Sequence, residues 1–325
     1  MINAKKQLLE VLKPWSHVNL YAVDPGATHF LIHLNALINE EYDNKITWYL
    51  EKWASQNFSF PNQSEQPVLD TISTSRRNDV YILGPQRDYA MSQLVMSRCK
   101  DVGAGVIFFL DHWKNLSEHF VTKESNTLVL PDVVLCPDES ARDKLKSDLE
   151  KMSLWKNEFE KIVRSFTHLA IEAACQSIRA IPNSTKTKLK QDLNKDQKVI
   201  LALLEPEEEG VGYTWQSALS TMIQYRDTHF PTHHIWLKPH PAQDENELRA
   251  HCHRHYKNVK NMTIVIGDVD PLIATADEVW GITTIALIKA LKCNKNIMSF
   301  QVGATQKGRE NSNPYIDPFV VLGKS

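Results

Sequence analysis

Short apolar runs separated by polar turns recur along the chain and predict a protein of the α/β class. Runs that are apolar throughout are typical of parallel strands buried on both faces, and stretches with apolar residues three and four positions apart are typical of helices. Strands are predicted at Val18–Val23, Thr47–Leu50, Asp79–Leu83, Val106–Leu110, Asp132–Cys136, Val199–Leu204, Ile235–Leu237, Thr263–Ile266, Glu278–Trp280 and Asn296–Phe300. The alternation of such strands with helices favours doubly wound domains, and we predict two Rossmann-like domains facing a cleft.

The segment 139–181 has a different pattern and suggests how the two domains are joined. Its apolar residues follow three- and four-residue steps, which predict two consecutive helices crossing from one domain to the other. Residues 183–198 are polar and lysine-rich without such a period, as in a linker. We therefore predict an N-terminal domain over 1–182, a C-terminal domain over 199–300, and a tail over 301–325.

Length and charge narrow the class of protein further. The chain has 325 residues, enough for two domains, and its net charge of −2 provides no general attraction for nucleic acid. No stretch reaches the length of a membrane span, and the first residues lack the apolar core of a signal peptide. The five cysteines are scattered and without ligand spacing, so we expect reduced thiols in a cytoplasmic protein.

The most informative chemistry follows the strand that ends near Leu237. Lys238 and His240 come directly after this strand, and Pro239 and Pro241 stand on either side of His240. Two prolines restrict the backbone, so the imidazole is presented from a stiff turn. We expect Lys238, His240 and Pro241 to contribute to a site for an anionic ligand.

A second candidate lies at the turn after Glu278–Trp280. Gly281 provides the turn, and Thr283 and Thr284 open the next helix. Threonine hydroxyls, unpaired backbone N–H groups and the positive end of a helix dipole together make an anion pocket. Taken alone, the threonine pair would serve equally well as a helix cap. Combined with a cationic turn in the same domain, it predicts a site for the phosphate or diphosphate of a nucleotide.

Polar residues at two strand ends in the N-terminal half are candidates for binding a second substrate. Asp24 and Gly26 follow the first strand, but a single glycine does not make a dinucleotide fingerprint, and Gly26 would also suit a tight turn. Asp111, His112 and Trp113 follow Val106–Leu110 and could hold a sugar, with Trp113 as a stacking face. In the alternative interpretation, Asp111 caps a helix and Trp113 fills the core between the domains.

Two further clusters have simpler explanations. The acidic run Glu205–Glu209 precedes a helix, where negative charge is favourable even without a catalytic role. His251, Cys252, His253 and His255 suggest a metal cluster at first sight. Alternating positions diverge around a helix, however, so we predict a surface helix and no metal site.

Three motifs in this order resemble those of the metal-independent bacterial sialyltransferases of the GT-B class. They are Glu208-Glu209-Gly210, Lys238-Pro-His240-Pro241 and Thr283-Thr284, which correspond to acidic-acidic-Gly, His-Pro and Ser/Thr-pair motifs. The resemblance implies that Glu209 or Glu208 is the general base, that His240 binds or protonates the departing phosphate, and that both threonines donate hydrogen bonds to it. The family pair is usually serine-rich, and the run Glu207–Glu209 leaves open which carboxylate is the base.

The resemblance also implies that the tail over 301–325 packs back on the N-terminal domain, and it implies a reaction. It would be an inverting, metal-independent transfer of a nonulosonic-type sugar from CMP to a glycan or glycolipid acceptor, in polysaccharide biosynthesis and without a cofactor. The protein would act in the cytoplasm, either free or at the inner face of the membrane. A transferase using a UDP- or GDP-sugar, and a nucleotide-sugar epimerase or hydrolase of the same fold, are the alternatives. A non-catalytic protein that binds a glycan or partner is a further one.

Overall fold

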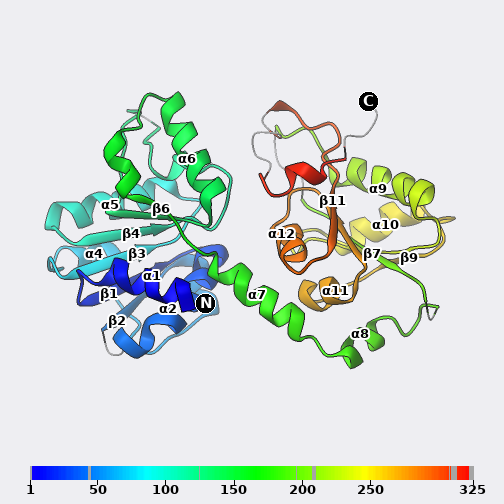
Figure 1. The fold of residues 1–325 in the computed structure, drawn as a ribbon, viewed down its shortest axis with the longest axis horizontal. Helices are drawn as coiled ribbons and strands as arrows, with labels where there is room; N and C mark the ends of the chain where they lie inside the picture. The colour runs from blue at the N-terminus through cyan, green and yellow to red at the C-terminus, as the bar shows by residue number, and fades with distance from the viewer. Residues whose placement is uncertain are drawn as a thin grey trace. The chain divides into compact units, whose positions relative to one another are not determined.

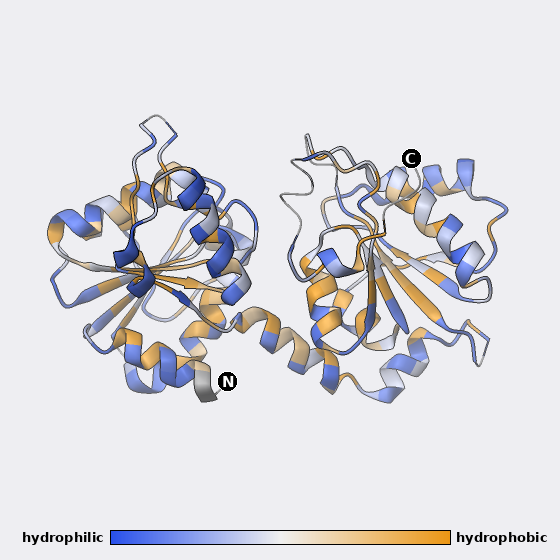
Figure 2. Ribbon diagram, turned by 45° about the horizontal axis from the view of Figure 1, so that its top comes forward, coloured by the Kyte–Doolittle hydropathy of each residue, from blue (hydrophilic) through white to orange (hydrophobic). Residues whose placement is uncertain are grey.

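Two parallel β-sheets organise the chain, one in each of two units that span Met1–Glu172 and Ala173–Ser325 (Figure 1). The computed structural model describes residues 2–42, 45–123, 125–194, 196–206, 210–306, 308 and 313–321. Hydrophobic residues follow the strands at the centre of each unit, whereas the helices around them are mixed in character (Figure 2). Among the described residues, no helix is both long and apolar enough to cross a membrane.

The first unit has a six-stranded sheet with the order β2-β1-β3-β4-β5-β6. Its strands are β1 (His17–Ala22), β2 (Ile46–Leu50), β3 (Asp79–Leu83), β4 (Gly105–Phe109), β5 (Val133–Cys136) and β6 (Val163–Ser165). Its helical segments are α1 (Ile2–Leu12), α2 (Pro25–Tyr42), α3 (Lys52–Asn57), α4 (Val68–Ile72), α5 (Tyr89–Val102), η1 (Ser117–His119), α6 (Glu139–Lys151) and η2 (Asn157–Lys161). Alternate residues of β1 to β5 pack with α1 and α2 in one buried cluster, because successive strand side chains point to opposite faces.

The second unit has a five-stranded sheet with the order β11-β10-β7-β8-β9. Its strands are β7 (Val199–Leu203), β8 (His234–Lys238), β9 (Met262–Ile264), β10 (Glu278–Gly281) and β11 (Asn296–Ser299). Its helices are α8 (Asn183–Leu189), α9 (Trp215–His229), α10 (Glu245–His255), α11 (Val269–Thr275), α12 (Ile285–Lys292) and η3 (Asp317–Phe319), and α7 (Leu169–Ala180) runs into it from the first unit. Apolar residues of α9 and α10 share a core with β7, β8 and β10.

Each sheet contains one point where the strand order reverses. In the first unit the chain runs from β1 to β2 on one side and then places β3 on the other side of β1. In the second unit β8 and β9 lie on one side of β7, and β10 lies on the other. Open α/β sheets bind ligands at the carboxyl ends of the strands beside such a point. The fold therefore marks the ends of β1 and β3, and of β7 and β10, as places for ligands.

The prediction of two consecutive helices over 139–181 is wrong in its middle part. Helix α6 ends at Lys151, Ser153 adopts a left-handed φ of 57°, and β6 pairs in parallel with β5. The apolar residues around Phe159 and Val163 follow helical steps in the sequence. They nevertheless lie in η2 and in a short edge strand, because pairing with β5 gives hydrogen-bond partners to the backbone N–H and C=O groups of that strand. A period of three or four residues does not separate these two outcomes over so short a segment.

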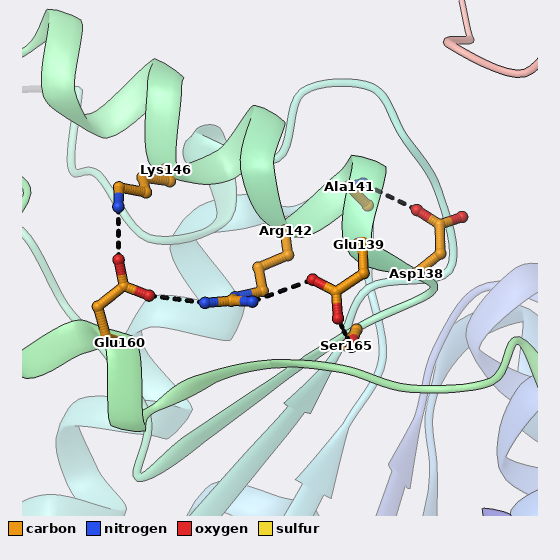
Figure 3. A network of polar contacts seen from close by, with 7 residues as sticks. All are labelled: Asp138, Glu139, Ala141, Arg142, Lys146, Glu160 and Ser165. Carbon is orange, nitrogen blue, oxygen red and sulfur yellow. Dashed lines mark hydrogen bonds and ion pairs between the residues drawn. The ribbon is translucent and has the colours of Figure 1, made fainter.

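A network of charged side chains fastens α6 to the edge strand β6 (Figure 3). Arg142 donates to Glu139 over 3.0 Å and to Glu160 over 2.7 Å, and Lys146 also pairs with Glu160. The Ser165 hydroxyl, at the end of β6, donates to Glu139. Four charges of alternating sign therefore connect the helix, the 3-10 segment and the strand that sequence periodicity had merged.

The domain boundaries also differ from the sequence-based expectation. The chain divides between Glu172 and Ala173, and the polar segment predicted as a linker contains α8, which packs against α11. Lys190 contributes to this attachment by pairing with Asp277 over 3.1 Å. A lysine-rich segment can thus belong to a domain surface when its charges are paired.

The described part of the tail contacts the second unit. Val320 forms a parallel bridge with Ser299, and the Thr305 hydroxyl donates to the Gly210 carbonyl over 2.7 Å. Gly212 has a φ of 86°, and a Cβ there would lie 2.4 Å from the Gly303 oxygen, so this approach requires glycine. These contacts attach 301–306 and 313–321 to their own unit.

Candidate functional site

Polar residues lie at or just after the carboxyl ends of three neighbouring strands of the second unit, and they form the candidate site. The adjacent strands β10, β7 and β8 all run in parallel, so their carboxyl ends lie on one edge of the sheet. Glu205 follows β7, Lys238 and His240 close β8, and Thr283 and Thr284 follow β10. The fold thus brings together two of the segments that the sequence singled out, with Glu205 between them.

The carboxylate of Glu205 lies at the start of α12. Its Oε1 accepts hydrogen bonds from the backbone N–H groups of Ile282, Thr283 and Thr284 at 3.0, 2.7 and 2.8 Å. Its Oε2 accepts from the Thr283 hydroxyl at 2.8 Å. Unpaired N–H groups and the helix dipole make a helix start attractive to anions, and hydrogen bonds to a charged acceptor are strong. A carboxylate of the same chain therefore takes up the donors that the sequence predicts for a phosphate.

The two threonines have different roles in this pocket. Thr284 is the N-cap of α12, and its hydroxyl oxygen accepts from the Ala286 N–H at 3.3 Å. Thr283 is buried and directs its hydroxyl to the carboxylate. Thr284 is therefore the helix cap, and both threonines donate to the carboxylate through their backbone N–H groups. Gly281 ends β10 directly before them.

His240 is exposed and held in one orientation by its own turn. Its backbone N–H donates to Gln243 Oε1 at 2.8 Å, and its ring Nδ1 accepts from the Ala242 N–H at 3.1 Å. Because Nδ1 is an acceptor, the neutral ring carries its proton on Nε2. Partial burial of the exposed side chain lowers the pKa of His240. The charge of Glu205 opposes this effect, and that of Lys238 adds to it. The neutral imidazole with an Nε2–H donor is therefore the main form at pH 7.

Lys238 and the prolines define the rest of this turn. Lys238 is half-buried and donates to the Pro239 carbonyl at 2.9 Å, and burial lowers its pKa. Pro239 is buried and Pro241 is exposed. The Gln243 side chain also donates to the Glu205 carbonyl at 3.4 Å, which joins the β8 turn to the end of β7.

In the first unit, Asp24 and Asp111 lie around the start of α2. Asp24 Oδ2 accepts from the Arg87 N–H at 2.7 Å, which ties the end of β1 to the segment after β3. A Cβ at Gly26 would lie 2.3 Å from Asp111 Oδ2, so the glycine leaves room for this carboxylate. Burial raises the pKa of Asp111 to about 7, and the charge of Asp24 adds to the shift. Asp111 can therefore gain and lose a proton near neutral pH.

The structure corrects the stacking role considered for Trp113. Its side chain is 1% exposed, its Nε1 donates to Asp138 Oδ2 at 2.8 Å, and its ring stacks on His168. All three residues belong to the first unit, so Trp113 fills the core of that unit and offers no face to a sugar. His112 is exposed beside it. Asp111 does not cap the next helical segment, because Leu116 is the N-cap of η1.

The proposed bases Glu208 and Glu209, with Glu207, lie outside the described residues. Glu205 was treated as part of the same acidic run, and its place in the anion pocket was missed. A sequence signal was available, since Glu205 is the first polar residue after the buried strand β7. Among the described residues, no group of three or more His, Cys, Asp or Glu is arranged to hold a metal ion, and the histidines of α10 are no exception.

No protein-family model matches this chain, and no curated protein matches its sequence. Solved structures resemble it. The Staphylococcus aureus MnaA–UDP co-structure aligns with a TM-score of 0.60 and 10% identity, over 90% of this chain and 80% of that one. A putative UDP-N-acetylglucosamine 2-epimerase from Listeria monocytogenes aligns with a TM-score of 0.61 and 11% identity, over 88% and 79%. A glycosyltransferase from Rickettsia africae aligns with a TM-score of 0.57 and 11% identity, over 89% and 80%.

These likenesses establish the fold. The neighbours have GT-B type folds, and the predicted α/β class with two Rossmann-like domains is confirmed. The resemblance to sialyltransferases in particular remains a prediction from the three short motifs.

Proposed function

We propose that this chain is a nucleotide-sugar-dependent enzyme whose second unit binds the phosphate of the donor at the ends of β10, β7 and β8. The supporting observation is the convergence of four donors on one anion at the start of α12. Such a pocket beside a reversal of strand order suits a phosphate.

The chemistry of sugar transfer matches the groups present. Negative charge grows on the leaving phosphate as the bond to the sugar breaks, and donors fixed in advance stabilise that charge. The N–H groups of Thr283 and Thr284 and the Nε2–H of His240 are such donors, each worth about 3–4 kcal/mol in comparable sites. Lys238 adds positive charge to the same edge of the sheet. This set can act on a phosphate with hydrogen bonds and charge from the protein alone.

The first unit would bind the acceptor. Asp111 is the described carboxyl best suited to act as general base, because its pKa of about 7 is matched to proton transfer at neutral pH. Base catalysis of this kind typically contributes about 10²–10⁴-fold in rate. Glu209 or Glu208 remains the base that the motif resemblance implies, and Asp24 and His112 are candidates for holding the acceptor.

The donor and the reaction type are the finer parts of the proposal. The three motifs favour a nonulosonic-type sugar linked to CMP and an inverting transfer to a glycan or glycolipid. Two similar structures are complexes with such a ligand: Staphylococcus aureus MnaA with UDP, and a UDP-GlcNAc 2-epimerase from Neisseria meningitidis with UDP-GlcNAc. This observation favours a UDP-sugar enzyme, either a transferase or a 2-epimerase, as the second candidate.

A thermal-shift panel of CMP, UDP and GDP tests the site and separates the donors. One nucleotide should stabilise the protein clearly, since ligand at about 100 times its dissociation constant adds about 2.7 kcal/mol. His240→Ala should reduce that shift, and His253→Ala on α10 should leave it unchanged. If no nucleotide raises the melting temperature, the proposed function fails and a glycan- or partner-binding protein becomes the better account.

Product analysis separates the two reaction types once a nucleotide is found. With the matching nucleotide-sugar and no acceptor, an epimerase produces an isomeric nucleotide-sugar. A transferase releases the nucleotide and extends a glycan when an acceptor is added. Formation of the isomer would overturn the transfer reaction and leave the donor site intact.

A further inference from the structure

Glu205 occupies the anion pocket in the way that a phosphate would. Its two carboxylate oxygens take up three backbone N–H groups and the Thr283 hydroxyl at the start of α12. Each of these donors makes one strong hydrogen bond at a time. A phosphate and the Glu205 carboxylate therefore cannot both be bound by this pocket.

Two roles for Glu205 are consistent with that arrangement. It could be a permanent clamp between the ends of β7 and β10, or it could be an occupant that leaves when the donor arrives. The position favours exchange, because the side chain lies at the reversal of strand order and is half-buried, with an exposed Pro206 after it.

The charges around the pocket also favour exchange. Lys238 is the last residue of the adjacent strand, and His240 follows two positions later. The charge of Glu205 raises the pKa of His240, and that of Lys238 lowers it. A phosphate carries at least the charge of a carboxylate and offers more acceptor oxygens to these neighbours. A nucleotide also gains contacts through its base and sugar, which Glu205 does not have.

We propose that Glu205 is the resting occupant of the phosphate pocket and that the donor binds by displacing its carboxylate. The inference rests on the proposed function, since it assumes that the pocket at α12 receives a donor phosphate. In the free protein the carboxylate keeps the donors of Ile282, Thr283 and Thr284 paired, and it competes with small anions that lack a nucleoside. Only molecules with an empty pocket can bind the donor, so the apparent affinity equals the intrinsic affinity multiplied by the fraction of molecules whose pocket is empty.

Calorimetric titration of the full-length protein with CMP, UDP, GDP and inorganic phosphate tests this exchange. Glu205→Gln keeps the shape and removes the charge, and Glu205→Ala empties the pocket. Glu205→Ala should bind the nucleotide about thirtyfold more tightly than the wild type, the factor that corresponds to about 2 kcal/mol, and Glu205→Gln should also bind it more tightly. Both should also gain measurable binding of inorganic phosphate, which the wild type binds weakly.

Glu278→Gln is the matched control. Glu278 lies at the opposite end of β10 and accepts from Trp280 Nε1, so the substitution changes the net charge equally and leaves the pocket intact. Its nucleotide affinity should equal that of the wild type. An equal gain in Glu278→Gln would show a general charge effect and overturn the exchange.

The remaining outcomes are also decisive. If the wild type binds a nucleotide and the Glu205 variants bind it equally or more weakly, Glu205 is a clamp and only the exchange is overturned. If neither wild type nor variants bind any nucleotide or phosphate, the proposed function fails, and the exchange with it. Binding by the variants alone would show that the donor does not displace Glu205 in the wild type, and would overturn the exchange together with the proposed function. Circular dichroism of each variant establishes that it is folded before its affinity is compared.

Discussion

Both units place a carboxylate beside the start of a helix at the carboxyl edge of the sheet, but the surroundings of the two carboxylates differ. In the second unit, Glu205 accepts four hydrogen bonds from the turn that opens α12. In the first unit, Asp111 lies against Gly26 in the first turn of α2, and burial raises its pKa to about 7. The Glu205 carboxylate is fixed in place by these donors, whereas burial favours the protonated form of Asp111.

This difference separates two functions that similar positions in the two units can serve. The pocket that saturates an anion with donors is suited to holding a phosphate. The carboxyl that is held with its pKa near neutrality is suited to moving a proton. Substitutions that remove these two carboxyl groups should therefore have opposite effects on stability, and four predictions use this contrast.

The largest effect is expected on activity, from Asp111→Asn. If Asp111 is the general base, turnover should fall by about 10²–10⁴-fold, because the amide cannot accept the proton. Activity of the wild type should fall as the pH drops through about 7, where Asp111 becomes protonated, and the residual activity of the variant should lose this dependence. A pH–rate profile of both proteins with the identified donor measures this.

Asp79→Asn is the control for that experiment. Asp79 lies at the amino end of β3 and accepts from the Arg76 N–H, away from the carboxyl edge. Its profile should match that of the wild type. If Asp111→Asn keeps its activity and its pH dependence, the base lies elsewhere, and the acidic run with Glu208 and Glu209 becomes the place to search.

The next largest effect is expected on stability, from Glu205→Ala. Loss of the carboxylate leaves the donors at the start of α12 without their partner, which should cost about 2–4 kcal/mol. Urea unfolding at pH 7 measures this loss. Glu247→Gln, on the exposed surface of α10, should change stability by less than about 0.5 kcal/mol. Equal stabilities of Glu205→Ala and Glu247→Gln would mean that the hydrogen bonds of the Glu205 carboxylate to the start of α12 do not stabilise the protein.

A smaller effect of opposite sign is expected from Asp111→Asn on stability. The pKa of Asp111 is raised in the folded protein, so the folded state binds the proton more tightly than the unfolded chain does. Stability therefore decreases as the pH rises from about 4 to about 7, and the amide should remove that decrease. At pH 8 the variant should be more stable by about 1–3 kcal/mol, and near pH 4 the two proteins should be alike. A destabilised variant at pH 8 would contradict the burial of this charge.

The smallest effect is expected from Arg142→Gln in the network of Figure 3. Arg142 is partly exposed and pairs with Glu139 and Glu160 through its side chain, where solvent screens the interaction. The loss should be below about 1 kcal/mol and should shrink in 1 M salt. An effect as large as that of Glu205→Ala would show that side-chain pairs hold a carboxylate as firmly as a helix start does.

Much of the fold could be predicted from the sequence because its strands are apolar on both faces. Asp79–Leu83 has the same bounds in sequence and structure, and most other strands agree closely. Helix α5 (Tyr89–Val102) was not predicted, although its buried residues Ser92, Val95, Met96 and Cys99 lie three and four positions apart. The edge strand β6 was missed because its apolar residues continue the helical period before it.

In the candidate site, too, some residues could be placed from the sequence and others could not. Lys238, His240, Thr283 and Thr284 could be placed at strand ends from local patterns. The role of Glu205 depends on β7 and β10 being neighbours, which joins residues 78 positions apart in the sequence. The burial of Trp113 likewise depends on Asp138 and His168, which local patterns do not bring together. Contacts between distant segments, rather than local propensity, decided both outcomes.

The central claim is that the start of α12 receives the donor phosphate, and a crystal structure with the nucleotide that stabilises the protein most tests it directly. The account predicts a phosphate oxygen within hydrogen-bonding distance of the Thr283 and Thr284 N–H groups and near His240 Nε2, with the Glu205 carboxylate moved out of the pocket. A nucleotide bound elsewhere, with Glu205 still bonded to Thr283, would contradict it.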